Sequence, residues 1–197
     1  MQNIDLVLIL GPMKSGKSYD LISHFAPLKY TNIPHALYQC ARHVREDKVL
    51  SRNGSGLEAT KILSLKEIPL DSYKVIGIDE VHMFPPEEVS AVDNLLKRGV
   101  KVIISGLDLD SRGLMFEMVK RIYELGPKEV RYKWAVCEQC KNPTATHTQI
   151  LSNGTPLTDA PSVLPDDGTY TYMAVCRNCF VKKDHYGSQP VETTSTQ

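Results

Sequence analysis

Residues 11–18 read Gly-Pro-Met-Lys-Ser-Gly-Lys-Ser, and this stretch decides the fold. It satisfies the pattern Gly-x-x-x-x-Gly-Lys-Ser/Thr, which binds phosphate when a strand precedes it and a helix follows. Both neighbours are predicted, because residues 4–10 form an apolar run typical of a buried strand and residues 15–28 have helical spacing. The residues expected to bind nucleotide phosphates are Gly11, Pro12, Met13, Lys14, Ser15, Gly16, Lys17 and Ser18.

The loop suits an anion for physical reasons. Glycines let the backbone adopt positive φ angles, so that N–H groups curl around phosphate oxygens. The helix that follows directs its positive N-terminal end at the same anion. Lys17 is expected to reach the β- and γ-phosphates, and the hydroxyl of Ser18 is expected to hold Mg²⁺. The alternative, a glycine turn with a surface lysine, does not explain the complete pattern in this context.

Short apolar runs alternate with helical patterns through the first two thirds of the chain. This alternation predicts βαβ units, and hence an α/β fold of the P-loop (RecA-like) type with a mainly parallel sheet and flanking helices. The further strands are expected at 34–38, 75–78 and 100–105, and the further helices at 85–98 and 112–125.

The pattern changes near residue 132, where cysteines, turns and short β-like runs begin to dominate. We expect a P-loop NTP-binding α/β domain over residues 1–131 and a small zinc-binding β lobe over residues 132–186. The polar residues 187–197 are expected to form a disordered tail.

Val75-Ile-Gly-Ile-Asp79-Glu80 places two carboxylates at the carboxyl end of a predicted strand. Ligands of open parallel sheets bind at this edge, so we expect the pair beside the phosphate loop. We assign Asp79 to the Mg²⁺ shell and Glu80 to the catalytic base that takes a proton from an attacking hydroxyl. Two solvated acids at a strand end are the alternative, which the complete phosphate loop disfavours.

Four of the five cysteines form two Cys-x-x-Cys pairs, Cys137 with Cys140 and Cys176 with Cys179, separated by 35 residues. Four thiolates from two turns predict a closed tetrahedral Zn²⁺ site, which has a structural role because no coordination position stays open. Free thiols or two disulfides are the alternatives. His147 lies between the pairs and is expected to be an ordinary surface histidine, since four sulfurs already complete the site.

The composition excludes some classes of partner. Of the 197 residues 42% are hydrophobic, which is enough for a core, and 23 basic residues balance 23 acidic ones. A neutral chain gives no reason to expect nucleic acid or an anionic membrane as partner. The first apolar run is too short to span a bilayer, so we expect no signal peptide, no membrane span and a reducing, cytoplasmic location.

Taken together and in order, these motifs resemble the type II thymidine kinases, a family with a P-loop domain and a zinc lobe. The resemblance covers about residues 4–182. It is carried by the stretches 11–18, 51–54, 76–80, 106–110 with 112–113 and Phe116, 135–140, Thr148-Gln149, Tyr172 and 176–179.

The resemblance implies transfer of the γ-phosphate of ATP, with Mg²⁺, to the 5′-hydroxyl of thymidine, and it assigns Glu80 as base. It makes the loop between the cysteine pairs a lasso that closes over the nucleoside and holds its base by backbone hydrogen bonds. It also implies a homotetramer and inhibition by thymidine triphosphate. The residues that it places around the nucleoside are Met13, Leu107, Phe116, Thr148 and Tyr172.

The sequence departs from this family at several positions. His82 and Met83 follow the acidic pair where the family has glutamine and aromatic residues, and Ser111 replaces an aromatic residue. Loss of aromatic surface predicts weaker stacking on the base and leaves the preferred nucleoside open. Either Arg42 or Arg45 corresponds to the arginine that the family carries after its second strand.

Two other functions compete with the kinase. One is a P-loop nucleotide-binding module whose zinc lobe contacts nucleic acid or protein, and the other is a catalytically silent regulatory relative. The neutral charge and the few basic residues beside the cysteines oppose the first, and the intact Lys17, Ser18 and Glu80 oppose the second. The residues assigned to the nucleoside also have a plainer alternative, since apolar side chains and a strand tyrosine often serve only as core.

Overall fold

A six-stranded, entirely parallel sheet forms the centre of the protein, with the strand order β5-β2-β6-β7-β1-β8. The computed structural model describes residues 5–42, 48–50, 56–161 and 168–182. Every residue of β1 and β6 is buried, as expected of strands covered on both faces. The strands are β1 (Leu6–Leu10), β2 (His35–Cys40), β5 (Thr60–Ile62), β6 (Val75–Asp79), β7 (Lys101–Gly106) and β8 (Glu129–Tyr132).

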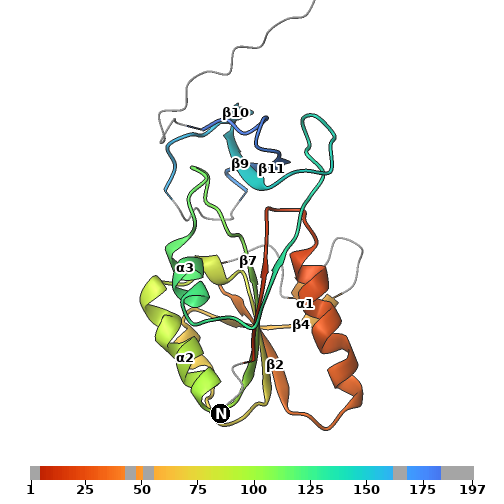
Figure 1. The fold of residues 1–197 in the computed structure, drawn as a ribbon, viewed down its shortest axis with the longest axis vertical. Coiled ribbons are helices and arrows are strands. Elements are labelled where there is room, and N and C mark those ends of the chain that lie inside the picture. Colours follow the sequence, from red (N-terminus) through yellow and green to blue (C-terminus); the bar gives the residue numbers. More distant parts are fainter. Residues whose placement is uncertain (1–4, 43–47, 51–55, 162–167, 183–197) are drawn as a thin grey trace, which may run out of the picture.

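Helices cover both faces of this sheet (Figure 1). Helix α1 (Lys17–Phe25) lies on one face, while α2 (Val89–Lys97) and α3 (Glu117–Tyr123) lie on the other. Each face has its own cluster of buried apolar side chains, and the larger cluster is the one under α2 and α3. The 3₁₀ turns are η1 (Ala26–Tyr30), η2 (Leu65–Glu67), η3 (Val81–Met83) and η4 (Pro86–Glu88).

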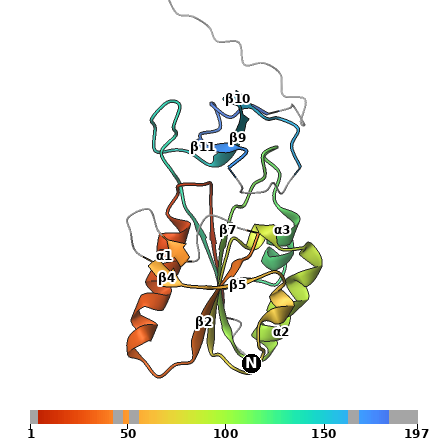
Figure 2. The same ribbon diagram turned by 180° about the vertical axis from the view of Figure 1, so that it is seen from behind.

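A smaller lobe lies beyond the carboxyl ends of the parallel strands, as both views show (Figures 1 and 2). Its antiparallel sheet has the order β10-β9-β11 and a separate small core built around the cysteines. Its strands are β9 (His147–Ser152), β10 (Thr155–Pro156) and β11 (Thr171–Val175). A further hairpin, β3 (Lys48–Leu50) with β4 (Gly56–Glu58), lies beside α1.

The structure confirms the α/β fold with a parallel sheet, flanking helices and a cysteine-bearing β lobe. The predicted helix at 85–98 divides into η4 and α2, and it ends before Gly99, whose φ is +73°. Within the described residues, no helix combines the length and the apolar character that a membrane crossing needs. The division into residues 1–131 and 132–186 stays a prediction, and the tail at 187–197 lies outside the described residues.

One sequence prediction at element level was wrong, and one strand was missed. The helix predicted over 112–125 begins only at Glu117. The side chain of Asp110 accepts hydrogen bonds from the N–H groups of Arg112 (2.9 Å) and Leu114 (3.1 Å), which holds these residues in a turn instead. Strand β8 was not predicted, because it is a short edge strand without a fully buried residue.

Candidate active site at the carboxyl edge of the sheet

The phosphate loop leaves the carboxyl end of β1 and passes directly under the backbone of Lys133. Gly11 has a φ of +143°, and a Cβ atom there would lie 2.2 Å from the carbonyl oxygen of Lys133. The N–H of Lys133 donates to the carbonyl oxygen of Leu10 at 2.7 Å, so the two segments are fixed together. Only glycine fits at position 11, since any side chain would collide with this backbone.

Left-handed and right-handed backbone conformations alternate along the turn of the loop. Lys14 and Gly16 both have left-handed backbones, with φ angles of 65° and 83°. Such a sequence of conformations makes a concave nest of N–H groups that suits an anion. The hydroxyl of Ser15 is buried and, in the described part of the protein, has no hydrogen-bond partner. A phosphate oxygen would satisfy this hydroxyl, so the loop fits the ligand expected from the sequence.

Lys17 begins α1, and its side chain is buried inside the loop. Its Nζ donates to the carbonyl oxygen of Pro12 at 2.7 Å. Burial lowers the pKa of Lys17, while the negative charges of Glu80, Asp79 and Asp108 act in the opposite direction. Asp79 ends β6, and Glu80 and Asp108 lie in the loops after β6 and β7, so the parallel sheet brings three acids and the loop lysine together at one edge.

Asp79 is the buried acid of this group. Ser105 Oγ donates a short hydrogen bond to Asp79 Oδ1, and Ser18 Oγ lies 3.4 Å from Oδ2. Burial and the charge of Glu80 raise the pKa of Asp79 to about 6, although Ser105 and Lys17 oppose the rise. A hydroxyl oxygen and a carboxylate oxygen that face each other are suitable ligands for Mg²⁺, so Ser18 and Asp79 fit the ion expected there.

Glu80 occupies an unusual backbone conformation directly after β6. Its φ of 54° and ψ of 40° are left-handed, which is rare for a residue other than glycine, asparagine or aspartate. Its carboxylate lies 3.5 Å from Nδ1 of His82, but this nitrogen accepts the N–H of Leu107 at 3.2 Å. Nδ1 therefore serves as an acceptor for a backbone N–H rather than as a donor to Glu80. The carboxylate is partly exposed, as a base that meets a substrate must be.

Two residues expected around the nucleoside meet across the junction between the sheet and the lobe. The N–H of Met13, in the phosphate loop, donates to Thr148 Oγ1 at 3.0 Å. Thr148 is the second residue of the lobe strand β9. Tyr172 lies half-buried on β11, opposite Ile150. These contacts place the lobe against the phosphate loop, while the assignment to the nucleoside stays a prediction.

The other two residues lie around His82. The N–H of Leu107 bonds to the His82 ring, and this ring packs on Phe116 with centroids 4.7 Å apart. Phe116 is also part of the larger core, so the plainer interpretation of this residue has support. Ser111 is buried, and within the described residues its hydroxyl has no partner. The ring of His82 therefore lies beside that of Phe116, where it adds aromatic surface. Ser111 is buried, so its side chain does not line an open pocket.

Several residues near the site were not assigned from the sequence. Asp108 has a pKa raised by burial and lies close enough to Lys17 for its charge to matter. Its position just after a strand could have revealed it. Arg42 donates to the carbonyl oxygen of Met83 at 3.0 Å, whereas Arg45 and the stretch 51–54 lie outside the described residues.

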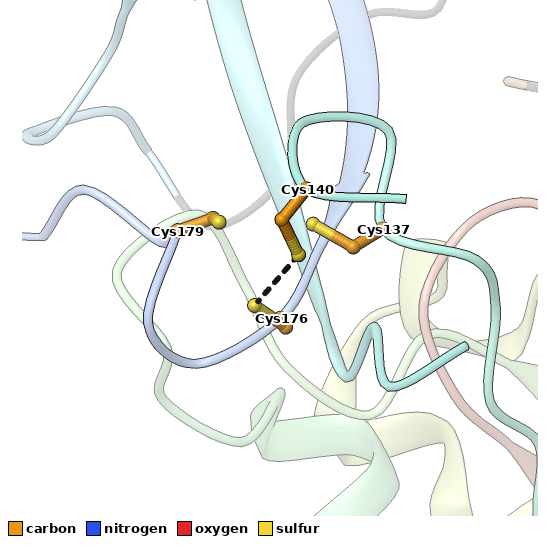
Figure 3. Close-up of side chains that lie close together, drawn as sticks. All are labelled: Cys137, Cys140, Cys176 and Cys179. Carbon is orange, nitrogen blue, oxygen red and sulfur yellow. Dashed lines mark hydrogen bonds between the residues drawn. The ribbon is translucent and has the colours of Figure 1, made fainter. Parts of the chain in front are cut away.

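The sulfur atoms of Cys137, Cys140, Cys176 and Cys179 converge from two turns (Figure 3) and lie within 4.8 Å of one another. The sulfur atoms of Cys140 and Cys176 are 3.8 Å apart, a distance far longer than the S–S bond of a disulfide. Four sulfurs bound tetrahedrally at about 2.3 Å from zinc would be about 3.8 Å apart, so the cluster fits the ion. His147 is outside this cluster and stacks on Phe180, with ring centroids 4.4 Å apart.

Backbone donors prepare the cluster for a cation. Burial raises the pKa of Cys137, but N–H groups of Cys140, Cys176 and Gln139 outweigh it and bring the value to about 6. The thiol partners of Cys179 raise its pKa to about 12. Without a metal the four thiols cannot all ionise together, whereas zinc requires the thiolate form and stabilises it.

Zinc content tests this site. We expect about one Zn²⁺ per chain, and Cys176→Ser should lower the retained zinc and the melting temperature, because three sulfurs leave the site open. Elemental analysis and thermal unfolding measure both. Cys40→Ala is the control for zinc retention alone, since Cys40 lies away from the cluster and its truncation in the main core lowers the melting temperature for a different reason. A folded wild-type protein without zinc, in which all four thiols react freely, would contradict the assignment.

The stability of the protein should report the ionisation of Asp79. Its folded-state pKa of about 6 exceeds the ordinary 3.8, so the folded state binds this proton more tightly and loses stability as the pH rises through 6. Asp79→Asn removes the buried charge. Its free energy of unfolding should therefore exceed that of wild type at pH 8 by up to about 3 kcal/mol, with a smaller difference at pH 5.

Urea unfolding in Mg²⁺-free buffer measures this difference at both pH values. Asp71→Asn is the control, because Asp71 is 80% exposed. An Asp79→Asn difference that is equal at pH 5 and pH 8 would show that the carboxyl group of Asp79 has no raised pKa.

Comparison with known proteins agrees with this geometry. A family model described as thymidine kinase matches residues 4–180. A thymidine kinase of Mycoplasma mobile is 33% identical over 180 residues, covering 89% of this chain and 86% of the relative. A thymidine kinase of Thermococcus kodakarensis is 36% identical over 182 residues, covering 87% and 91%. A thymidine kinase of Chloroflexus aurantiacus is 33% identical over 181 residues, covering 88% and 92%. The protein therefore belongs to the thymidine kinase family.

Proposed function

We propose that the protein transfers the γ-phosphate of ATP to the 5′-hydroxyl of thymidine, giving thymidine monophosphate and ADP in nucleotide salvage. The observation that carries the proposal is the meeting of Lys17, Asp79 and Glu80 at one edge of the sheet, beneath a cysteine-bearing lobe. The curated relatives, whose printed name is thymidine kinase, support thymidine as the acceptor.

The phosphate end of the reaction belongs to the loop. In this proposal the backbone of residues 11–16 and the hydroxyl of Ser15 surround the β- and γ-phosphates, and Lys17 turns its ammonium group from Pro12 to the transferred group. Ser18 and Asp79 hold the metal shell. Bound Mg²⁺ would neutralise charge on the phosphates. Ser105 keeps one oxygen of Asp79 occupied, so that the other faces Ser18.

Glu80 accepts the proton of the 5′-hydroxyl as the oxygen attacks the γ-phosphorus. The left-handed backbone at Glu80 turns its side chain away from the line of β6, while Asp79 stays buried. The two adjacent acids thus have different environments and different tasks, one at the metal and one at the hydroxyl.

The nucleoside lies between the lobe and the edge of the sheet. We place Thr148 and Tyr172 on the lobe side and Met13, Leu107 and Phe116 on the sheet side of this space. The residues between the cysteine pairs close over the base as a lasso, although 162–167 lie outside the described residues. Base recognition by backbone groups would tolerate His82 and Ser111. A homotetramer, inhibition by thymidine triphosphate and a cytoplasmic location complete the proposal.

A nucleoside panel tests the proposed reaction. MgATP and thymidine, deoxyuridine, deoxycytidine or a purine deoxynucleoside are incubated with the protein, and the nucleoside monophosphate and ADP are separated chromatographically. Thymidine or deoxyuridine should give both products in equal amounts. ADP release that no nucleoside stimulates would overturn the proposal, and a preference for purines would overturn the assigned base contacts.

Glu80→Gln should lower kcat about 10²–10⁴-fold, the usual contribution of general-base catalysis, because the amide keeps the size but accepts no proton. The KM for ATP should change less than twofold. Initial rates of thymidine monophosphate formation measure both values. Glu87→Gln is the matched control, since Glu87 is exposed on η4. A fall in kcat of less than threefold would assign the base to another group.

A further inference from the structure

Lys14 lies in the phosphate loop, but its side chain turns away from the loop to the zinc lobe. Its Nζ lies 2.5 Å from both carboxylate oxygens of Glu138, a residue 124 positions later in the chain. Glu138 stands between Cys137 and Cys140, inside the first cysteine turn. The pair therefore joins the loop that binds nucleotide phosphates to the turn that carries half of the metal cluster.

Glu138 is itself held firmly in the lobe. Its N–H donates to the carbonyl oxygen of Ala174 at 2.8 Å, and its carboxylate accepts the N–H of Ala174, also at 2.8 Å. Ala174 is fully buried in β11, two residues before Cys176. A carboxylate fixed to both halves of the cysteine cluster is an anchor rather than a mobile surface acid.

The backbone of Lys14 needs such an anchor. Its φ of 65° is a conformation that a lysine adopts rarely, yet the nest of the loop depends on it. The residue before it is held too, because the N–H of Met13 donates to Thr148 of the lobe. Two successive loop residues are thus bound by the lobe, one through its backbone and one through its side chain.

The geometry points to Lys14 and Glu138 as positioning residues for ATP, which hold the phosphate loop in its binding conformation through the metal-bearing turn. Lys14 then acts on ATP through Glu138 and its own backbone, and its ammonium group is not a ligand of the phosphates. The inference rests on the proposed kinase function for its kinetic readout, but its binding readout needs no catalysis.

The ion pair is partly open to solvent, which weakens its contribution to folding, so we expect its effect in ATP binding. The side chains of Lys14 and Glu138 are 23% and 35% exposed. A charge-swap cycle separates this positioning role from a direct contact with phosphate. Lys14→Glu and Glu138→Lys each place two like charges together, and the double variant restores opposite charges with their places exchanged.

Each single reversal should raise the KM for ATP and the Kd of a fluorescent ATP analogue about three- to tenfold. The KM for thymidine should stay within twofold, and the zinc content should stay at that of wild type. The double variant should bind ATP more tightly than either single variant, and the recovery is partial because a lysine at position 138 cannot accept the N–H of Ala174. Lys97→Glu and Asp93→Lys are the matched controls, because that pair on α2 has the same 2.5 Å distance far from the site.

Three outcomes overturn the inference. If only Lys14→Glu weakens ATP binding and the double variant stays as weak, Lys14 contacts phosphate directly. If Glu138→Lys tightens ATP binding, the added positive charge attracts ATP directly, and the ion pair with Lys14 does not determine the affinity. If neither single variant changes ATP binding, the contact has no positioning role. Should a reversal prevent folding, Lys14→Met, Glu138→Gln and their double variant replace it, and the coupling then appears as a double variant that binds ATP no more weakly than either single one.

The failure of the proposed function would look different. A protein that phosphorylates no nucleoside but binds the ATP analogue, with the charge-swap pattern intact, would refute the kinase and keep the positioning role. A protein that phosphorylates thymidine but does not show the charge-swap pattern would support the kinase and refute the positioning role.

Discussion

The parallel pairing of β1 between β7 and β8 is the constraint on which the site depends. Its register aligns Leu10 with Gly106 on one side and with Tyr132 on the other, so three strands end at the same level. The loop after β1 binds phosphate in our proposal, and the loop after β7 carries Asp108. The chain after β8 crosses Gly11 and enters the lobe. Strand β8 thus decides where the lobe lies, directly over the phosphate loop.

The site concentrates conformations and charges that are unfavourable elsewhere. Lys14 and Glu80 have left-handed backbones, Lys17 and Asp79 are buried, and the hydroxyl of Ser15 has no partner within the described residues. Each feature costs free energy that well-packed surroundings must offset. The fully buried strands β1 and β6 supply that support, because they anchor both segments to the rigid centre of the sheet.

Local patterns made much of this predictable from the sequence. The phosphate loop, the acidic pair and the cysteine quartet each consist of a few residues at short spacing, whose chemistry requires that spacing. Strand β8 was missed because its side chains are half-exposed or exposed, and the late start of α3 because it depends on hydrogen bonds to the side chain of Asp110. Glu138 could not have been found, since its role depends on a partner 124 positions away.

The phosphate loop and the cysteine lobe form one structural unit at the carboxyl edge of the sheet, joined by the contacts of Met13 with Thr148 and of Lys14 with Glu138. Hydrogen–deuterium exchange of the zinc-loaded and zinc-stripped protein tests it most directly, because local opening appears as faster amide exchange. Zinc removal should accelerate exchange in residues 11–18 as well as in 135–151, while α2 should exchange as before. Faster exchange confined to the lobe, with an unchanged phosphate loop, would contradict it.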